Sequence, residues 1–508
     1  MPAPAAPAPL YLRLAGVMEK MIARQALQPG AKLPSVREFG RQQRVSVPTA
    51  LHAYALLEDR GLVEARPKSG YYVRPRHLET LATPVTPARP VRIADLASTD
   101  VFDWLLDHSA PNATPFGAAL PSPALLPGER LARIMSAAAR RLGPASSSYD
   151  FAPGFFPLRR EIARRAMASG CTLGPDDLVI TVGTTEAIYL ALRATCEAGD
   201  TVLLESPGYF GFVRQLRQMR LKAIPIPVDA NHGMDVDAVA AALRRTRVSA
   251  CIVTANFQNP MGCLMPDARK RDLVRLLAAN GVAIIEDDIY GDLPHHGSRP
   301  RALKSYDPDG SVLLCSSFSK TLAPGYRVGY IAAGRWSERI LALKKITTLA
   351  GPLLPTVAIA EFLRNGGYDR YLRSFRESCR RQVEQMRCAI GELFPAGTRV
   401  SRPAGSFLLW CELPRPVDTL QLFEQATSAG IHLAPGPMFS THGGFRNFMR
   451  INCGYPWSPD LERSIGILAH LVRAQSVRGS ARILPPTGNG AHPLPAVPSR
   501  RARPSRRR

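Results

Sequence analysis

The chain has 508 residues, of which 45% are hydrophobic and 21% charged, and a formal net charge of +24 at pH 7. This length exceeds what one hydrophobic core can organise, so we expect roughly two to four domains. The chain contains no apolar run that could cross a membrane, no signal-peptide pattern, and nine cysteines that stand singly without a CxxC or Cys/His cluster. The composition therefore predicts a cytoplasmic protein without a disulfide framework, a membrane span or a metal site.

The positive charge is concentrated at the two ends of the chain. Residues 1–77 contain twelve Lys and Arg against five Asp and Glu, and residues 474–508 contain eight Arg and no acidic residue. Concentrated positive charge favours a polyanion such as DNA. A basic, Pro-rich segment can equally be a solubilising appendage, and we assign residues 474–508 as a disordered basic tail.

Three short helices and a hairpin are predicted over residues 10–76, after an Ala- and Pro-rich, disordered start at residues 1–9. The run LYLRLAGVMEKMIARQAL has helical apolar spacing, LPSVREFGRQQ opens with the capping-box spacing at Ser35, and SVPTALHAYALLEDRG starts a third helix at Ser46. The run LVEARPKSGYYVRP gives two β-prone stretches around a Lys-Ser-Gly turn. This order predicts a winged helix-turn-helix domain.

Such a domain provides a specific set of candidate DNA contacts. The N-terminal residues of its second paired helix enter the major groove, while the supporting helix and the wing contact phosphates. The candidates on these three elements are Ser35, Arg37, Ser46, Thr49, His52, Lys68 and Gly70. The alternative, that short basic helices only solvate a small domain, is not excluded by these residues alone.

The segments LPSVREFG and VSVPTALHAYALLEDRGLVEARPKSGYYV closely resemble the winged DNA-binding domain of the GntR family of bacterial repressors. The resemblance covers Leu10 to Val73 and implies operator DNA as a partner. The chain departs from the family at one position, because many members have arginine after the serine that opens the reading helix, whereas this chain has Val47.

An interdomain linker and an α/β domain are predicted to follow. Residues 77–92 are rich in Pro and Thr and have no periodicity, which is typical of a linker. From residue 93 to residue 473, apolar runs such as LVITVG, TVLLES, ACIVT, VAIIED and SVLLC alternate with helical patterns. This alternation predicts a large α/β domain with a mainly parallel sheet, followed by a smaller α+β region.

Lys320 lies in SFSKTLAPGYR, after an apolar run, where a single lysine is usually a surface charge. Other residues change this interpretation, because their chemical types together suit pyridoxal phosphate. This cofactor needs an amine for its aldehyde, an anion for its ring nitrogen, donors for its phenolic oxygen and phosphate, and a ring to stack on. The candidates are Lys320 for the Schiff-base amine, Asp287 for the anion, Tyr290 and Asn259 for the phenolic oxygen, Tyr209 for stacking, and Gly183, Thr184, Thr185, Ser317, Ser319 and Arg327 for the phosphate.

The motifs NPMG, DDIY and SFSK, with an arginine seven residues after the lysine, strongly resemble those of the fold-type I aminotransferases. The resemblance implies roles for two further residues. Tyr149 matches a tyrosine that reaches the phosphate of the neighbouring subunit, which implies a homodimer. Arg450, in NFMRINCGY, matches the arginine that binds the substrate α-carboxylate. The chain has NPMG where NPTG is usual, but Met261 is not a cofactor contact.

A GntR domain followed by an aminotransferase-like domain resembles the MocR subfamily of bacterial transcriptional regulators. The resemblance implies a dimer that binds operator DNA and responds to pyridoxal phosphate, alone or with an amino-acid or amine effector. An alternative is a working aminotransferase, transferring the amino group of an amino acid to a 2-oxo acid, with a DNA-binding module attached. A third possibility, a DNA-binding protein that has lost its cofactor, conflicts with the complete set of residues around Lys320.

Overall fold

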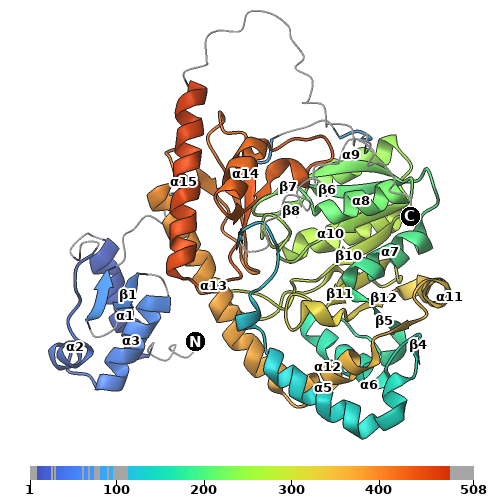
Figure 1. Ribbon diagram of the computed structural model, residues 1–508, viewed down its shortest axis with the longest axis horizontal. Coiled ribbons are helices and arrows are strands. Elements are labelled where there is room, and N and C mark those ends of the chain that lie inside the picture. The colour runs from blue at the N-terminus through green and yellow to red at the C-terminus, as the bar shows by residue number, and fades with distance from the viewer. Residues whose placement is uncertain are drawn as a thin grey trace, which may run out of the picture.

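The computed structural model describes residues 9–23, 27, 30–59, 62–66, 69–73, 81–87, 91–94, 96 and 113–480. Within these ranges the chain forms a small N-terminal domain and a much larger α/β part (Figure 1). The predicted wing residue Lys68 lies outside the described residues, as do most of the predicted N-terminal segment and the predicted tail from residue 481 onward.

The N-terminal domain is a winged helix-turn-helix, as predicted. Its elements are α1 (Leu10–Ala23), α2 (Val36–Gln42), α3 (Val47–Asp59) and an antiparallel hairpin of β1 (Val63–Arg66) and β2 (Gly70–Val73). The side chain of Ser35 caps α2 by accepting the backbone N–H of Glu38 at 3.2 Å, which matches the capping-box spacing. Tyr54 of α3 is fully buried, stacks on Phe39 at 5.1 Å and donates its hydroxyl to the carbonyl of Pro34 at 2.9 Å. These contacts fix α3 against α2.

The large domain is built on an eight-stranded sheet, most of whose strands are labelled in Figure 1. The strand order is β5 (Leu178–Thr181), β12 (Gly329–Ala332), β11 (Val312–Ser317), β10 (Ala283–Asp287), β9 (Ala250–Val253), β6 (Thr201–Ser206), β7 (Lys222–Asp229) and β8 (Gly233–Met234). The five central strands from β11 to β7 are parallel, whereas β12 is antiparallel to both of its neighbours and β8 is antiparallel to β7. The predicted mainly parallel sheet is confirmed.

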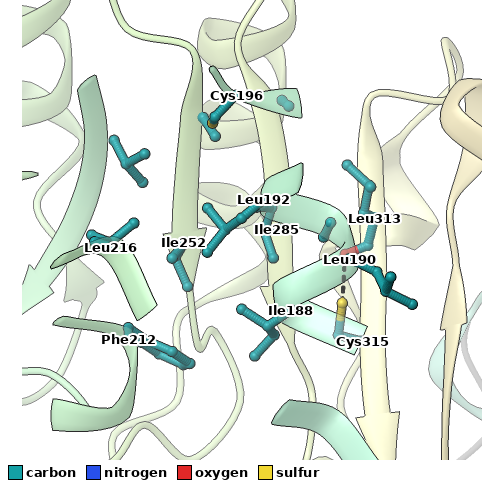
Figure 2. Close-up of a cluster of buried hydrophobic side chains, with 14 of the residues drawn as sticks. Ile188, Leu190, Leu192, Cys196, Phe212, Leu216, Ile252, Ile285, Leu313 and Cys315 are labelled. Carbon is teal, nitrogen blue, oxygen red and sulfur yellow. Dashed lines mark hydrogen bonds between the residues drawn. The ribbon is translucent and has the colours of Figure 1, made fainter. Parts of the chain in front are cut away.

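Helices cover both faces of this sheet, which explains why its strands are continuous apolar runs. Alternate residues of one strand face opposite sides, so Val202 packs under α7 (Gly183–Thr195) and α8 (Phe210–Gln218), while Leu203 packs under α9 (Val236–Arg245) and α10 (Asp267–Ala279). Figure 2 shows the first cluster, in which Ile188 and Leu192 of α7 lie over Ile252 and Ile285 of the strands.

Of the remaining helices, some pack on the large sheet, whereas the C-terminal ones form, with the smaller sheet, the smaller α+β part that was predicted. The helices are α5 (Gly128–Leu142), α6 (Phe156–Ala166), α11 (Ser337–Thr347), α12 (Leu353–Arg364), α13 (Gly367–Leu393), α14 (Thr419–Ser428) and α15 (Pro459–Ser480). The smaller sheet has the order β14 (Arg399–Val400), β15 (Leu408–Glu412), β18 (Phe448–Asn452) and β17 (Ala434–Pro435), and two further pairs join β3 (Thr114–Pro115) to β16 (Ile431–His432) and β4 (Asp150–Phe151) to β13 (Ala350–Gly351). Since α15 ends at Ser480, the first seven residues of the predicted tail continue a helix. No helix among those described is long and apolar enough to span a membrane.

The described parts of the predicted linker are attached to the large domain. Leu81 packs against the smaller α+β core, and the carbonyl of Ala82 accepts the backbone N–H of Val400 at 2.9 Å. Further along, the hydroxyl of Thr86 donates to the carbonyl of Val228 at 2.7 Å. These bonds hold the segment along the surface of the large domain.

One buried side chain of α13 contacts the end of the reading helix α3. Arg380 is 4% exposed and donates from Nη1 to the carbonyl of Asp59 at 2.7 Å. The same guanidinium pairs with Glu377 at 2.7 Å and with Glu384 at 2.9 Å. Because a helix leaves its last carbonyls unpaired, Arg380 supplies a donor that the C-terminal end of α3 lacks.

Candidate cofactor site and DNA-binding surface

The predicted cofactor residues converge at the edge of the sheet where the parallel strands end, which is where α/β proteins place ligands. A pocket of ≈ 360 Å³ opens there. Its lining includes Thr184, Thr185, Tyr209, Asn259, Asp287, Tyr290, Ser317, Ser319, Lys320, Arg327 and Arg450. The structure thus brings together residues that are up to 266 positions apart in the sequence, from Thr184 to Arg450.

Lys320 is held inside the pocket by a main-chain acceptor. Its Nζ donates to the carbonyl of Ala119 at 2.7 Å. The pKa of Lys320 is lowered to about 8, mainly by burial and also by the positive charges of Arg450 and Arg327, against the opposing effect of the Asp287 carboxylate. Near neutral pH this amine therefore has a larger uncharged fraction than an exposed lysine.

Asp287 is the last residue of β10 and is buried. The pKa of its carboxyl is raised to about 7, mainly by burial, although the backbone N–H of Ile289, at 3.3 Å, and the positive charge of Lys320 act to lower it. The neighbouring carboxylate of Asp288 raises it. A positive group placed in the pocket would favour the ionised form of Asp287.

The start of α7 has the geometry expected of an anion site. Gly183 has φ +78°, and a Cβ there would lie 2.6 Å from Nη2 of Arg327, so only glycine allows the guanidinium to approach this closely. The buried Oγ1 of Thr184 has no hydrogen-bond partner among the described residues. Nearby, the backbone N–H of Ser319 donates to Oγ of Ser317 at 3.3 Å. Unpaired donors at a helix N-terminus are suited to a phosphate.

Arg450 also lines the pocket and is 2% exposed. Its Nη1 donates to Oδ1 of Asn259 at 2.9 Å, and its Nη2 donates to the carbonyl of Gly117. Its Nε is buried and has no partner within the described part of the chain. Burial lowers the pKa of Arg450 to about 10, which still leaves the guanidinium charged at neutral pH. Arg450 therefore retains the charge needed to bind a carboxylate.

Two tyrosines complete the set in the pocket. Tyr209 precedes α8 and packs against Phe212 at 5.2 Å, and Tyr290 packs against Phe407 at 5.9 Å. Burial raises the pKa of both phenols, so each hydroxyl stays protonated and can donate.

Tyr149 does not line this pocket. It is 71% exposed, and its ring lies 5.5 Å from that of Phe151, which is also on the surface. The side chain is thus accessible to another molecule and is not part of the site of its own chain.

The predicted DNA-binding residues lie around α2 and α3. Ser46 accepts the backbone N–H of Thr49 at 3.3 Å, and the two hydroxyls are 2.8 Å apart, so both take part in the start of α3. Arg37 is exposed on α2, and His52 is exposed on α3 with its ring edge against Tyr11 at 5.8 Å. Ser35 is exposed before α2, and Gly70, with φ +110°, begins the second strand of the wing.

Several further residues of the pocket have no recognisable signal in the sequence. The carbonyl of Ala119 holds Lys320, but a main-chain acceptor has no side-chain signature. His432, Met438 and Phe210 also line the pocket, and each is a single residue outside any motif. Burial lowers the pKa of His432, with a further contribution from Arg450, so its ring is uncharged at neutral pH.

These residues fit pyridoxal phosphate. The pocket contains a buried amine at Lys320, a buried carboxylate at Asp287 and a phenolic donor at Tyr290. The unpaired Oγ1 of Thr184, at the start of α7, can donate to a phosphate. Each chemical requirement of the cofactor has a matching group on the wall of one pocket.

Comparisons with known proteins agree with this architecture. Residues 126–458 match the family described as aminotransferase class I and II, and residues 10–73 match the gntR family of bacterial regulatory proteins. The HTH-type transcriptional regulator YdcR of Escherichia coli (strain K12) is 36% identical over 91% of this chain and 99% of its own length. The regulator YjiR of the same strain is 38% identical over 88% of this chain and 95% of its own length.

The solved structure of LysN, an α-aminoadipate aminotransferase from Thermus thermophilus complexed with N-(5′-phosphopyridoxyl)-L-leucine, superposes with a TM-score of 0.68. The two chains are 26% identical, and the superposition covers 76% of this chain and 96% of LysN. Pyridoxal phosphate is thus the cofactor of the aminotransferase family to which this domain belongs. With its two matched domains and its full-length relatives, the chain belongs to the MocR subfamily of GntR-family DNA-binding transcriptional regulators.

Proposed function

We propose that this regulator binds pyridoxal phosphate at Lys320 and an amino compound beside it, and that this binding changes its affinity for operator DNA. The observation that carries the proposal is Lys320, a buried amine with a lowered pKa that lines the same pocket as Thr184 and Arg327. The same chain also has the reading helix α3. A DNA-binding regulator of this kind acts in the cytoplasm, where bacterial DNA lies.

Each residue has a distinct task in this proposal. When bound, pyridoxal phosphate supplies an aldehyde that condenses with amines and a ring that accepts electrons. Lys320 takes up or releases a proton at Nζ, and the ionised carboxylate of Asp287 would stabilise a proton on the ring nitrogen. Tyr290 donates from its hydroxyl, and the start of α7 with Arg327 holds the phosphate.

The charges in the pocket favour one class of effector. The acidic residue of the described lining is Asp287, and the basic ones are Lys320, Arg327 and Arg450, since His432 is neutral. The cofactor engages Asp287, Lys320 and Arg327, which leaves Arg450 for a carboxylate. No further charged group of the described lining remains to pair with a second charge on the effector. Such a charge would be buried without compensation, which is costly. We therefore propose an amino acid with one carboxylate and an uncharged side chain.

A homodimer is also part of the proposal. Tyr149 and Phe151 are 71% and 58% exposed, and Phe151 pairs through β4 with Ala350 of β13, next to the exposed Leu349. Exposed aromatic and aliphatic side chains that gather on neighbouring strands are typical of a protein–protein contact. A second copy would bury this surface and bring Tyr149 to the partner's pocket.

The test is a DNA-binding assay on the promoter adjacent to the gene, with the full chain, with and without pyridoxal phosphate and a panel of amino acids. We expect the cofactor, alone or with an amino acid, to change the apparent affinity. Lys320→Ala should abolish both this change and the visible absorption of the bound cofactor. If Lys320→Ala leaves both unchanged, the proposal is wrong.

A working aminotransferase remains the second candidate, and a specific observation favours it. The pocket has the amine, the anion and the carboxylate-binding arginine that transamination needs: Lys320, Asp287 and Arg450. The two functions are separated by assaying the same samples for a 2-oxo acid. Its accumulation with turnover would support the enzyme, whereas a DNA response without turnover would support a sensor.

A further inference from the structure

Two apolar side chains lie exposed on the reading helix α3. Val47 and Leu51 are each 46% exposed and lie one turn apart, on the same face of the helix. Other large side chains of α3, Tyr54 and Leu57, are fully buried in the core of the domain. The exposed pair is therefore not part of that core. A single exposed apolar residue needs no explanation, but a matched pair at this position does.

The pair lies at the part of the helix that enters the major groove. Val47 is the first residue of α3, and in helix-turn-helix domains the N-terminal residues of the second helix contact base edges. Pro48, between the two, is exposed and has no N–H to donate. The first one and a half turns of the helix thus present a mostly apolar surface to the outside.

Three exposed arginines lie on the neighbouring helix and in the turn that leads into α3. Arg37 and Arg41 are exposed on α2, and Arg44 is exposed in the turn before α3, with φ +51°. Guanidinium groups at these positions suit the phosphates that flank a groove. The positive charge next to this apolar face favours DNA as its partner, because phosphates flank the groove and attract cations.

We infer that Val47 and Leu51 read the 5-methyl groups of thymine in each operator half-site. The major-groove edges of the four base pairs present hydrogen-bonding groups and one apolar group, the thymine methyl. Valine and leucine have neither donors nor acceptors, so that methyl is the group they can recognise. The inference rests on DNA binding through α3 and adds the chemistry of the bases at two positions.

The experiment uses the full chain and a random-sequence DNA library. Duplexes that the protein retains are sequenced, and the best one is resynthesised with 2′-deoxyuridine in place of each thymine in turn, which removes only the methyl group. At the contacted positions we expect each replacement to weaken binding by about three- to fivefold, the value for one buried methyl-sized group.

Variants assign the contacts to the two side chains. Val47→Ala and Leu51→Ala should each weaken binding to the thymine duplex, and the deoxyuridine replacement at the contacted position should then cause no further loss. Val17→Ala is the matched control, because Val17 is an equally apolar and 54% exposed side chain on α1, which is not the helix that enters the groove, and its replacement should leave affinity unchanged.

Two results would overturn the inference about thymine while leaving DNA binding through α3 unchallenged. One is that no deoxyuridine replacement weakens binding of the unmodified protein. The other is that the replacements weaken binding equally in Val47→Ala, Leu51→Ala and the parent chain. If the library yields no retained duplex, both the inference and DNA binding through α3 fail.

Discussion

Replacing Arg380 by alanine is expected to loosen the C-terminal end of the reading helix without changing its core. The substitution removes the 2.7 Å hydrogen bond to the carbonyl of Asp59 and leaves that carbonyl without its charged donor. A hydrogen bond from a charged group contributes about 1.5–3 kcal/mol. The ion pairs with Glu377 and Glu384, whose side chains are 41% and 26% exposed, add less than about 1 kcal/mol each because solvent screens them.

Native-state hydrogen exchange measures this effect locally, which suits a chain of several domains. For the last-turn amides of α3 we expect about tenfold faster exchange in Arg380→Ala. This factor corresponds to the lower end of the range of about 1.5–3 kcal/mol for a hydrogen bond from a charged group. Arg381→Ala is the control, because Arg381 is 62% exposed and its nearest acid, Glu377, is 3.7 Å away. Equal exchange in the two variants would refute the assignment of Arg380 as the cap of α3.

Three further predictions follow from single residues. Because the neutral amine reacts with the aldehyde, the affinity of Lys320 for pyridoxal phosphate should rise as pH increases towards about 8 and then level off, and a flat titration of the visible absorption would contradict this. Gly183→Ala should weaken cofactor binding at least tenfold, since its Cβ would lie 2.6 Å from Nη2 of Arg327 and its φ of +78° disfavours alanine; calorimetry with pyridoxal phosphate would measure the loss. Tyr54→Phe should destabilise the N-terminal domain by about 1 kcal/mol through loss of the bond to Pro34, seen as a lower melting temperature of that domain.

The sequence was most informative where chemistry depends on side chains in short motifs. The strand ends that carry Asp287 and Ser317 were visible as apolar runs followed by polar residues, because a buried parallel strand needs an apolar run and its ligands follow its last residue. The winged domain could also be predicted from the sequence, because the capping bond that begins α2 joins Ser35 to Glu38, three residues along the chain.

Features that depend on tertiary contacts were not accessible from the sequence. The carbonyl of Ala119, which holds Lys320, could not be identified, because every residue has a carbonyl and only the fold selects one. Likewise, Arg380 was one arginine in a charged helical stretch, and its contact with Asp59 joins residues 321 positions apart. The attachment of the Pro- and Thr-rich segment also escaped prediction, because low periodicity describes a free linker and a bound one alike.

The attachment of that segment limits how far the DNA-binding domain can travel. Leu81 packs against the large domain and Val73 ends the wing, so only the eight residue steps between them are available as a tether. A fully extended chain covers about 3.4 Å per residue, so the wing can be no more than about 27 Å from its anchor. Any effect of the effector on the DNA-binding domain must therefore act within about 27 Å of the point where Leu81 is anchored.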